Sequence, residues 1–272
     1  MVLWLIKIVS PLSYLVSSYF YLRYFINRGE SDKTWAKITD TMAILLHGLL
    51  LILLSLHTGH LPLAEPFQAL TTFMFFFATL NKLLIVNKKE YSLGVFHSFI
   101  LFIFQLISML FIEVHAPLPD ILKNIFFEVH VIFNLVGYAS FSSAFLTGIM
   151  YVLLFHEIKG RKLGYFYDRL PSLGYLEKLN FRAILIGFIF NTIGIVLGAC
   201  TGKTAWGTYW AWDPKLIAVV IAWITYAMAI IGKINFHWKG KRLAYLSMIG
   251  FTWIIFSMLI INVYFSKIHS FN

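Results

Sequence analysis

The stretch FRAILIGFIFNTIGIVLGACTGKTAWGTYWAWDPKLIAVVIAWITYAMAI, residues 181–230, decides the fold class of this 272-residue chain. Two long apolar runs lie on either side of a short connection that is crowded with large aromatic rings. A helix needs roughly 20 largely apolar residues to cross a bilayer, so each run predicts one membrane span. The connection, AWGTYWAWDPK at residues 205–215, then predicts a loop at the membrane surface.

Long apolar runs recur along the whole chain, which is 60% hydrophobic and only 12% charged, against roughly 25% charged residues in a soluble domain. The sequence predicts an all-α, polytopic integral membrane protein with about eight transmembrane helices, forming a single transmembrane domain over residues 1–272. The N-terminal run lacks the residue order of a cleaved signal peptide and is interpreted as the first span. The predicted spans are 8–26, 39–57, 66–86, 92–112, 126–155, 182–200, 214–232 and 246–266.

The loops between these spans differ sharply in positive charge. Of the 22 Lys and Arg residues, 17 fall in one alternating set of loops and 5 in the other set, which includes both termini. Because positively charged loops stay cytoplasmic, both termini and the loop at about 203–215 are predicted to lie outside. This distribution explains the net charge of +10 through membrane orientation, so membrane lipid is the expected contact and nucleic acid is not.

The aromatic loop has two interpretations. Its large rings are Trp206, Tyr209, Trp210 and Trp212. Tryptophan and tyrosine at a membrane boundary usually form an aromatic belt, but a belt is spread over several helix ends. Rings crowded into one loop also suit a platform for a flat apolar ligand, because aromatic faces stack on extended π systems. The nearby Gly198, Gly202 and Gly207 are expected to loosen the backbone around such a platform.

Histidines stand on either side of this loop in sequence. His130 begins the fifth predicted span just after an outer loop, and His269 follows the last span. Imidazole is a common ligand of haem iron, so the pair could supply two axial nitrogens at the outer face. A single interfacial histidine is, however, usually only a tolerated polar residue, and this interpretation stays open for each. His47 and His97 lie within spans two and four, where a functional role and a helix-packing role are both open.

Polar residues at the edges of the loop also have competing interpretations. Lys203 and Lys215 suit the propionates of a haem through charge-assisted hydrogen bonds, and suit lipid headgroups as well. Asp213 and Pro214 suit the start of the next helix, with Asp as the N-cap and Pro in the first turn. Cys200 is the only cysteine, which excludes a disulfide within the chain and favours a packing role for this residue.

These residues resemble a known family. WGTYWAWDPK is similar to the WWD motif of haem-handling proteins, and within that group the chain resembles the CcsA/ResC proteins of System II cytochrome c biogenesis. Further segments resemble the same family in the same order over roughly residues 45–272. They include TGHLPLAEPFQAL at 58–70, HVIFNLVGYASF at 130–141 and IHSFN at 268–272.

The resemblance implies a haem b cofactor at the outer face, with His130 and His269 as the axial ligands of its iron. The haem-contacting residues that it implies on the loop are Trp206, Gly207, Tyr209, Trp210, Trp212, Asp213 and Pro214. The implied location is a bacterial inner or plasma membrane or the thylakoid, with the WWD loop on the periplasmic, external or lumenal side.

The implied function is that of the haem-handling subunit of a cytochrome c synthase, a lyase-type complex with a CcsB/ResB partner. Haem is presented to the CxxCH segment of apocytochrome c, and thioether bonds form to the haem vinyl groups. A thioredoxin-like thiol reductant acts on the apocytochrome. The resemblance assigns no catalytic residue, since the chemistry belongs largely to the cofactor and the substrate thiols.

The sequence departs from the family pattern at three places. The usual DPKETW reads DPKLIAVV here, Gln68 replaces a usual Glu, and Ile231 stands where many relatives carry an inner histidine. These departures keep a second hypothesis open, a HemX-like haem-binding accessory membrane protein without synthase activity. A transporter of another solute is disfavoured, because Asp40 and Glu128 lie near span ends rather than centrally.

Overall fold

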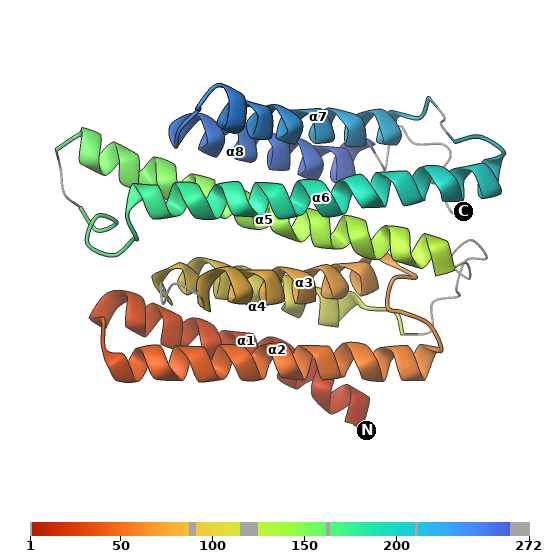
Figure 1. Cartoon of the computed structure of the whole chain (residues 1–272). Coiled ribbons are helices and arrows are strands. Elements are labelled where there is room, and N and C mark those ends of the chain that lie inside the picture. Colours follow the sequence, from red (N-terminus) through yellow and green to blue (C-terminus); the bar gives the residue numbers. More distant parts are fainter. Residues whose placement is uncertain (1, 87–90, 115–124, 162–163, 210–211, 262–272) are drawn as a thin grey trace. The chain divides into compact units, whose positions relative to one another are not determined.

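The computed structural model describes residues 2–86, 91–114, 125–161, 164–209 and 212–261 (Figure 1). Within these ranges the chain forms helices and the segments that connect them, and eight helices are long and apolar enough to cross a membrane. The all-α, polytopic membrane fold with eight spans is therefore confirmed. The outward placement of both termini stays a prediction.

The chain falls into two compact units. The first, Met1–Leu118 with Asp168–Pro171, holds α1 (Val2–Asn27), α2 (Glu30–Thr58), α3 (Pro66–Val86), the 3₁₀ helix η1 (Tyr91–Leu93) and α4 (Gly94–Phe111). The second, Pro119–Tyr167 with Ser172–Asn272, holds α5 (Ile125–Lys159), α6 (Leu173–Trp206), α7 (Pro214–Asn235), α8 (Lys241–Phe256) and the π-helical turn η3 (Ser257–Ile261). The single domain over residues 1–272 stays a prediction.

A buried polar layer links the four long helices of the first unit. The hydroxyl of Tyr14 on α1 lies 3.0 Å from His47 Nδ1 on α2, and His47 Nε2 lies 2.9 Å from Thr71 Oγ1 on α3. Thr71 donates to Gln105 Oε1 on α4 at 3.0 Å, and Gln105 donates back to Ser10 Oγ on α1 at 3.2 Å. All five side chains are fully buried. Because lipid offers no hydrogen bonds, this layer fixes the register of the four helices.

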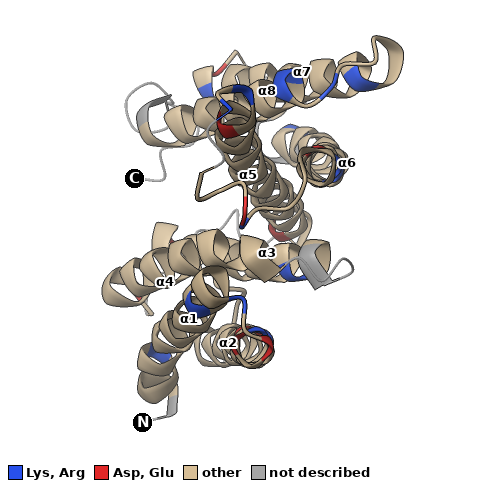
Figure 2. Cartoon of the chain, turned by 90° about the vertical axis from the view of Figure 1, so that its left-hand side faces the viewer, with Lys and Arg blue, Asp and Glu red and all other residues tan. Residues whose placement is uncertain are grey.

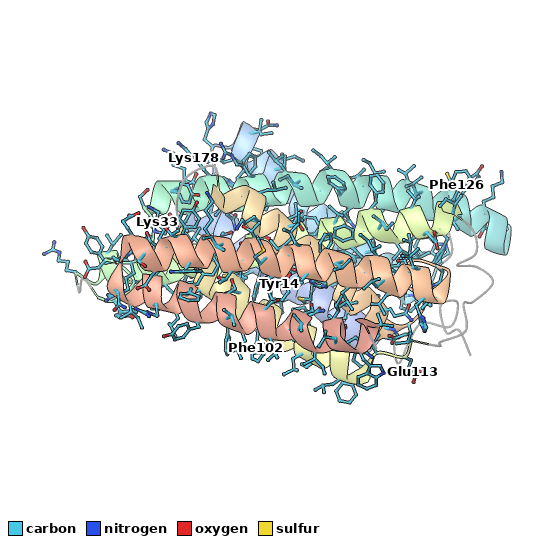
Figure 3. The ribbon with its side chains drawn as sticks, turned by 90° about the horizontal axis from the view of Figure 1, so that it is seen from below. Tyr14, Lys33, Phe102, Glu113, Phe126 and Lys178 are labelled. Carbon is cyan, nitrogen blue, oxygen red and sulfur yellow. The ribbon has the colours of Figure 1, made fainter. Side chains whose placement is uncertain are left out.

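The same layer shows how a histidine is accommodated inside the first unit. Tyr14 is labelled midway along α1 in Figure 3, so the layer lies deep within the helical bundle. Both ring nitrogens of His47 have hydrogen-bond partners on neighbouring helices. This arrangement corresponds to the helix-packing role, one of the two roles that the sequence left open for His47. His97 on α4 is also buried and packs against the ring of Phe77 on α3, with ring centroids 5.7 Å apart.

Two buried acidic residues of the first unit form ion pairs. Asp40 is buried on α2 and accepts from Lys82 Nζ of α3 at 2.6 Å. Asp32, near the start of α2, pairs with Arg23 Nε of α1 at 3.1 Å. A buried carboxylate is tolerated when it is paired and hydrogen-bonded. The Asp40 pair therefore joins α2, which begins ten residues earlier at Glu30, to the last turns of α3.

In the second unit, α6 packs on α5 and α7 packs on α8. The α5–α6 contact is close because a glycine of α6 receives an aromatic ring of α5. A Cβ atom on Gly187 would lie 2.5 Å from the ring of Phe141, which no real contact allows. Phe141 also stacks on Tyr226 of α7, with ring centroids 3.6 Å apart and planes 3° apart. One buried pair of rings thus joins α5, α6 and α7.

Candidate functional site

One end of the second unit gathers the residues that the sequence singled out. The start of α5, the end of α6, the start of α7 and the end of α8 with η3 lie at the same end of this unit (Figure 1). His130 is in the second turn of α5, and the 205–215 connection joins α6 to α7. Successive helices run in opposite directions, so this topology brings His130 and the aromatic loop together. His269 lies outside the described residues, and its pairing with His130 stays a prediction.

The aromatic loop is shorter than the sequence suggested, because α6 continues to Trp206 rather than ending at about residue 200. Gly198 and Gly202 are therefore helical, and the expectation that they loosen the backbone is wrong. No proline interrupts this segment, so the helix continues until a residue adopts a left-handed conformation. That residue is Gly207, with φ +78°, whose N–H caps the Lys203 carbonyl at 2.9 Å.

The Asp-Pro pair begins α7. The side chain of Asp213 accepts a hydrogen bond from the backbone N–H of Lys215 at 2.9 Å, and Pro214 occupies the first turn. A carboxylate at this position satisfies a backbone donor that the helix leaves unpaired, and proline lacks the donor altogether. Asp213 is only 3% exposed, in keeping with this capping contact. The predicted helix-start role of the pair is confirmed, while a contact of either residue with haem stays a prediction.

The loop presents at least two large rings to its surroundings. Tyr209 is 57% exposed and Trp212 is 84% exposed. The ammonium group of Lys203 donates to the Tyr209 hydroxyl at 2.8 Å and lies 4.3 Å from the centre of its ring. Lys203 thus orients Tyr209 in the structure. The side chain of Trp206 and all of Trp210 lie outside the described parts, so their roles stay predictions.

His130 is held by the helix next to it. Its Nδ1 lies 2.6 Å from the carbonyl oxygen of Gly194 on α6. A carbonyl can only accept, so Nδ1 carries the hydrogen, and the neutral imidazole keeps its lone pair on Nε2. A histidine that binds a metal usually donates its other ring N–H to such a carbonyl or to a carboxylate. The contact with the Gly194 carbonyl therefore assigns the hydrogen to Nδ1, and the amide nitrogen of Asn134 also lies near the ring, 3.1 Å from Nδ1 and 3.5 Å from Nε2.

Gly198 makes room for the imidazole. A Cβ atom at this position would lie 2.4 Å from His130 Cε1 and 2.7 Å from Nδ1. Contacts this short do not occur, so any larger residue at Gly198 would displace the ring. Gly198 thus leaves space for the His130 side chain, and the close approach of α5 and α6 depends on this glycine.

Two asparagines that were not predicted from the sequence extend the α5–α6 contact at His130 along the two helices. Asn191 donates to Asn134 Oδ1 at 2.8 Å, and Asn134 donates to the His130 carbonyl at 3.0 Å. Gly194 admits the Asn134 side chain, since a Cβ there would lie 2.6 Å from Oδ1. The sequence feature that could have identified these asparagines is a polar amide inside each of two apolar runs. Buried amides in membrane helices form hydrogen bonds across helix contacts.

Lys215 connects the loop to the histidine. It is the second residue of α7, two residues after the capping residue Asp213. The start of α7 and the start of α5 lie at the same end of the second unit (Figure 1). An anionic group bound at this end would meet the cation and the imidazole together, which is the arrangement expected for a haem propionate and its iron.

The donor set fits haem better than a bare metal ion. Within the described residues, no group of three or more His, Cys, Asp or Glu side chains comes together. His130 contributes one imidazole at the end of the unit that carries Lys215 and the exposed rings of Tyr209 and Trp212. An iron that brings four porphyrin nitrogens needs only axial ligands from the protein. These residues therefore suit a haem rather than a protein-ligated metal centre.

The comparisons with known proteins follow the same line. Residues 64–269 match the family model described as cytochrome C assembly protein. The chain belongs to the cytochrome c assembly protein family. Several curated relatives are named cytochrome c biogenesis protein CcsA, so the resemblance to CcsA proteins is confirmed. The relative from Chlamydomonas reinhardtii is 30% identical over 82% of this chain and 65% of its own length.

Two other matches give the extent of the similarity. CcsA of Prochlorococcus marinus (strain MIT 9301) is 28% identical over 97% of this chain and 94% of its own length. The chain covers a smaller share, 57%, of the relative from Guillardia theta. Among solved structures, the cytochrome c haem lyase CcmF matches with a TM-score of 0.62 at 17% identity. That match covers 91% of this chain and 45% of CcmF, and it shows a shared fold.

Proposed function

We propose that this chain is the haem-handling subunit of a System II cytochrome c synthase. The observation that carries the proposal is the hydrogen bond from His130 Nδ1 to the Gly194 carbonyl at 2.6 Å, at the end of the unit where the WWD loop lies. This bond fixes the imidazole so that Nε2 keeps its lone pair. The family assignment and the names of the relatives support the same function.

In this proposal the protein holds haem b between two histidines on the outer side of the membrane. His130 and His269 would hold the haem iron through their imidazoles, and the rings of the WWD loop would stack on the porphyrin. The high exposure of Tyr209 and Trp212 is in keeping with such contacts. Lys203 and Lys215 neutralise the propionates, and Asp213 with Gly207 sets the shape of the loop.

The reaction that this site serves is thioether formation. Haem supplies two vinyl groups, and each cysteine thiol of a CxxCH segment adds its sulfur and its hydrogen across one vinyl double bond. The protein's contribution is to orient the haem edge towards the incoming apocytochrome c. The thiols must be reduced, which is the proposed task of a thioredoxin-like protein, and a CcsB/ResB-like membrane protein completes the synthase.

The alternative is a HemX-like accessory protein that binds haem without synthase activity. Ile231 supports it, because this residue, aligned with the inner histidine of many relatives, is 50% exposed on α7. The intact WWD loop favours the synthase. Both proposals share the outer haem site and differ in whether holocytochrome is made.

Co-expression of this chain with a CcsB/ResB-type partner and a reporter apocytochrome c tests the proposal, in a host that lacks its own assembly system. Covalent haem is measured by haem staining after denaturation. The synthase proposal predicts holocytochrome with the wild type, none with His130→Ala, and full yield with Gly174→Ala, because a Cβ at Gly174 meets no atom within 4 Å. Haem-loaded protein without holocytochrome would instead establish the accessory function.

A further inference from the structure

A groove in the first unit is separate from the residues discussed so far. It lies between the first half of α2 and the 3₁₀ helix η1, and its volume is about 510 Å³. Lys33 and Lys37 line it from α2, and Tyr91 lines it from η1. Figure 2 looks onto the end of the first unit where α1 ends and α2 begins, which is the end that carries these lysines.

The groove is basic at one end and apolar at the other. Lys37 is exposed and forms no ion pair with any described residue, whereas Lys33 is held by Glu30 at 3.0 Å. Ile38 and Met42 continue the wall one turn further along α2, and both are exposed, at 42% and 52%. A cation above an apolar wall is complementary to a molecule with an anionic head and a hydrocarbon tail.

The apolar wall extends well beyond the groove. Leu45, Leu49 and Ile52 follow on the same face of α2 at helical spacing, and each is at least 42% exposed. An acyl chain that starts in the groove could therefore lie along this face towards the middle of the bilayer. The basic end lies on the first turns of α2, at the side of the membrane where Lys and Arg are concentrated and which is predicted to be cytoplasmic.

The threonine hydroxyl groups in the groove favour a lipid headgroup that carries hydrogen-bond donors. Thr34 and Thr41 donate their hydroxyl hydrogens to the carbonyls of Glu30 and Lys37, one turn back, at 2.9 and 2.7 Å. Their oxygens can then only accept. A headgroup that combines a phosphodiester with hydroxyl groups would pair its phosphate with the lysines and its hydroxyls with these oxygens.

We propose that this groove binds an anionic phospholipid of the phosphatidylglycerol type, with the phosphate on Lys33 and Lys37 and an acyl chain along Ile38 and Met42. Basic pockets beside membrane helices recognise acidic headgroups in this way. The site lies wholly within the first unit and does not depend on the haem proposal.

Native mass spectrometry of the purified full chain tests the site, with phosphatidylglycerol or phosphatidylcholine added in detergent. The wild type is expected to retain phosphatidylglycerol in preference to phosphatidylcholine. The double variant Lys33→Gln/Lys37→Gln is expected to bind it at least about tenfold more weakly, because each lysine near an anionic lipid changes affinity roughly fivefold. The matched control is Lys239→Gln/Lys241→Gln, which removes the same charge from two exposed lysines of the second unit.

Equal loss in both double variants would mean that net charge alone attracts the lipid, and would overturn the proposal. Unchanged retention in the groove variant would do the same. Displacement of the lipid by 10-fold excess inorganic phosphate would show that the groove recognises free phosphate rather than a lipid. Circular dichroism of each variant confirms that the helices remain folded.

Discussion

His130 and Gly194 are joined across the α5–α6 contact, with His130 Nδ1 2.6 Å from the Gly194 carbonyl oxygen. The bond uses a backbone acceptor, which no side-chain substitution can remove. It fixes both the orientation and the tautomer of the imidazole before any ligand arrives. The neighbouring glycine and asparagine then decide how accurately the ring is held, and they are open to mutation.

Gly198→Ala tests the space around this ring. The added Cβ would lie 2.4 Å from His130 Cε1, so the ring or the helices must shift. We expect a loss of about 1–3 kcal/mol in unfolding free energy, as for other overpacked sites, together with reduced haem occupancy. Absorption spectra and thermal unfolding measure the two effects.

The control is Gly174→Ala on the same helix, where the methyl group meets nothing within 4 Å. This variant should keep its haem and be at least as stable as the wild type. Full haem occupancy in Gly198→Ala, at wild-type stability, would show that His130 does not lie against this glycine.

Asn134→Leu tests the amide that connects His130 to Asn191. The substitution removes the donor to the His130 carbonyl and the acceptor for Asn191. Since outer partners of a ligating histidine typically change metal affinity by about 10- to 100-fold, we expect weaker haem binding that added imidazole partly restores. Haem titration followed at the Soret band measures the affinity.

Asn180→Leu serves as the comparison, because Asn180 is a buried amide of α6 that bonds to the Ala144 carbonyl and to Ser247. It should lower stability but leave haem affinity unchanged once the protein is folded. If both asparagine variants lose haem equally, Asn134 acts only through folding.

His47→Ala separates a packing histidine from a haem ligand. The change removes the hydrogen-bond partner of the Tyr14 hydroxyl, whereas Thr71 keeps its bond to Gln105, and a buried group left unpaired costs about 1–3 kcal/mol. We expect a lower melting temperature with the haem spectrum unchanged. A well-folded His47→Ala protein with an altered haem spectrum would instead place this residue at a second haem site.

The sequence was sufficient for much of this structure. Run length and hydropathy predicted eight spans, because a bilayer imposes one length on every crossing helix. Asp213 and Pro214 predicted the start of α7, since capping depends on chemistry within a single turn. Both features are local, and local rules were adequate for them.

Features that depend on contacts between helices could not be predicted from the sequence in the same way. The role of Gly198 depends on what faces α6 at this point, namely the His130 imidazole on α5. Asn134 and Asn191 are 57 residues apart, and nothing in the spacing indicates that their amides meet. The closed layer around His47 likewise joins four helices that only packing brings together.

The most direct test of the haem site is the visible absorption spectrum of the detergent-purified protein, as isolated and after dithionite. His130→Ala and His269→Ala are measured beside the wild type, with and without added imidazole. The proposal predicts sharp reduced bands of six-coordinate haem that are lost in each variant and restored by imidazole. A well-folded wild-type protein that stays free of haem, even when supplied with haem and its CcsB/ResB-type partner, would contradict it.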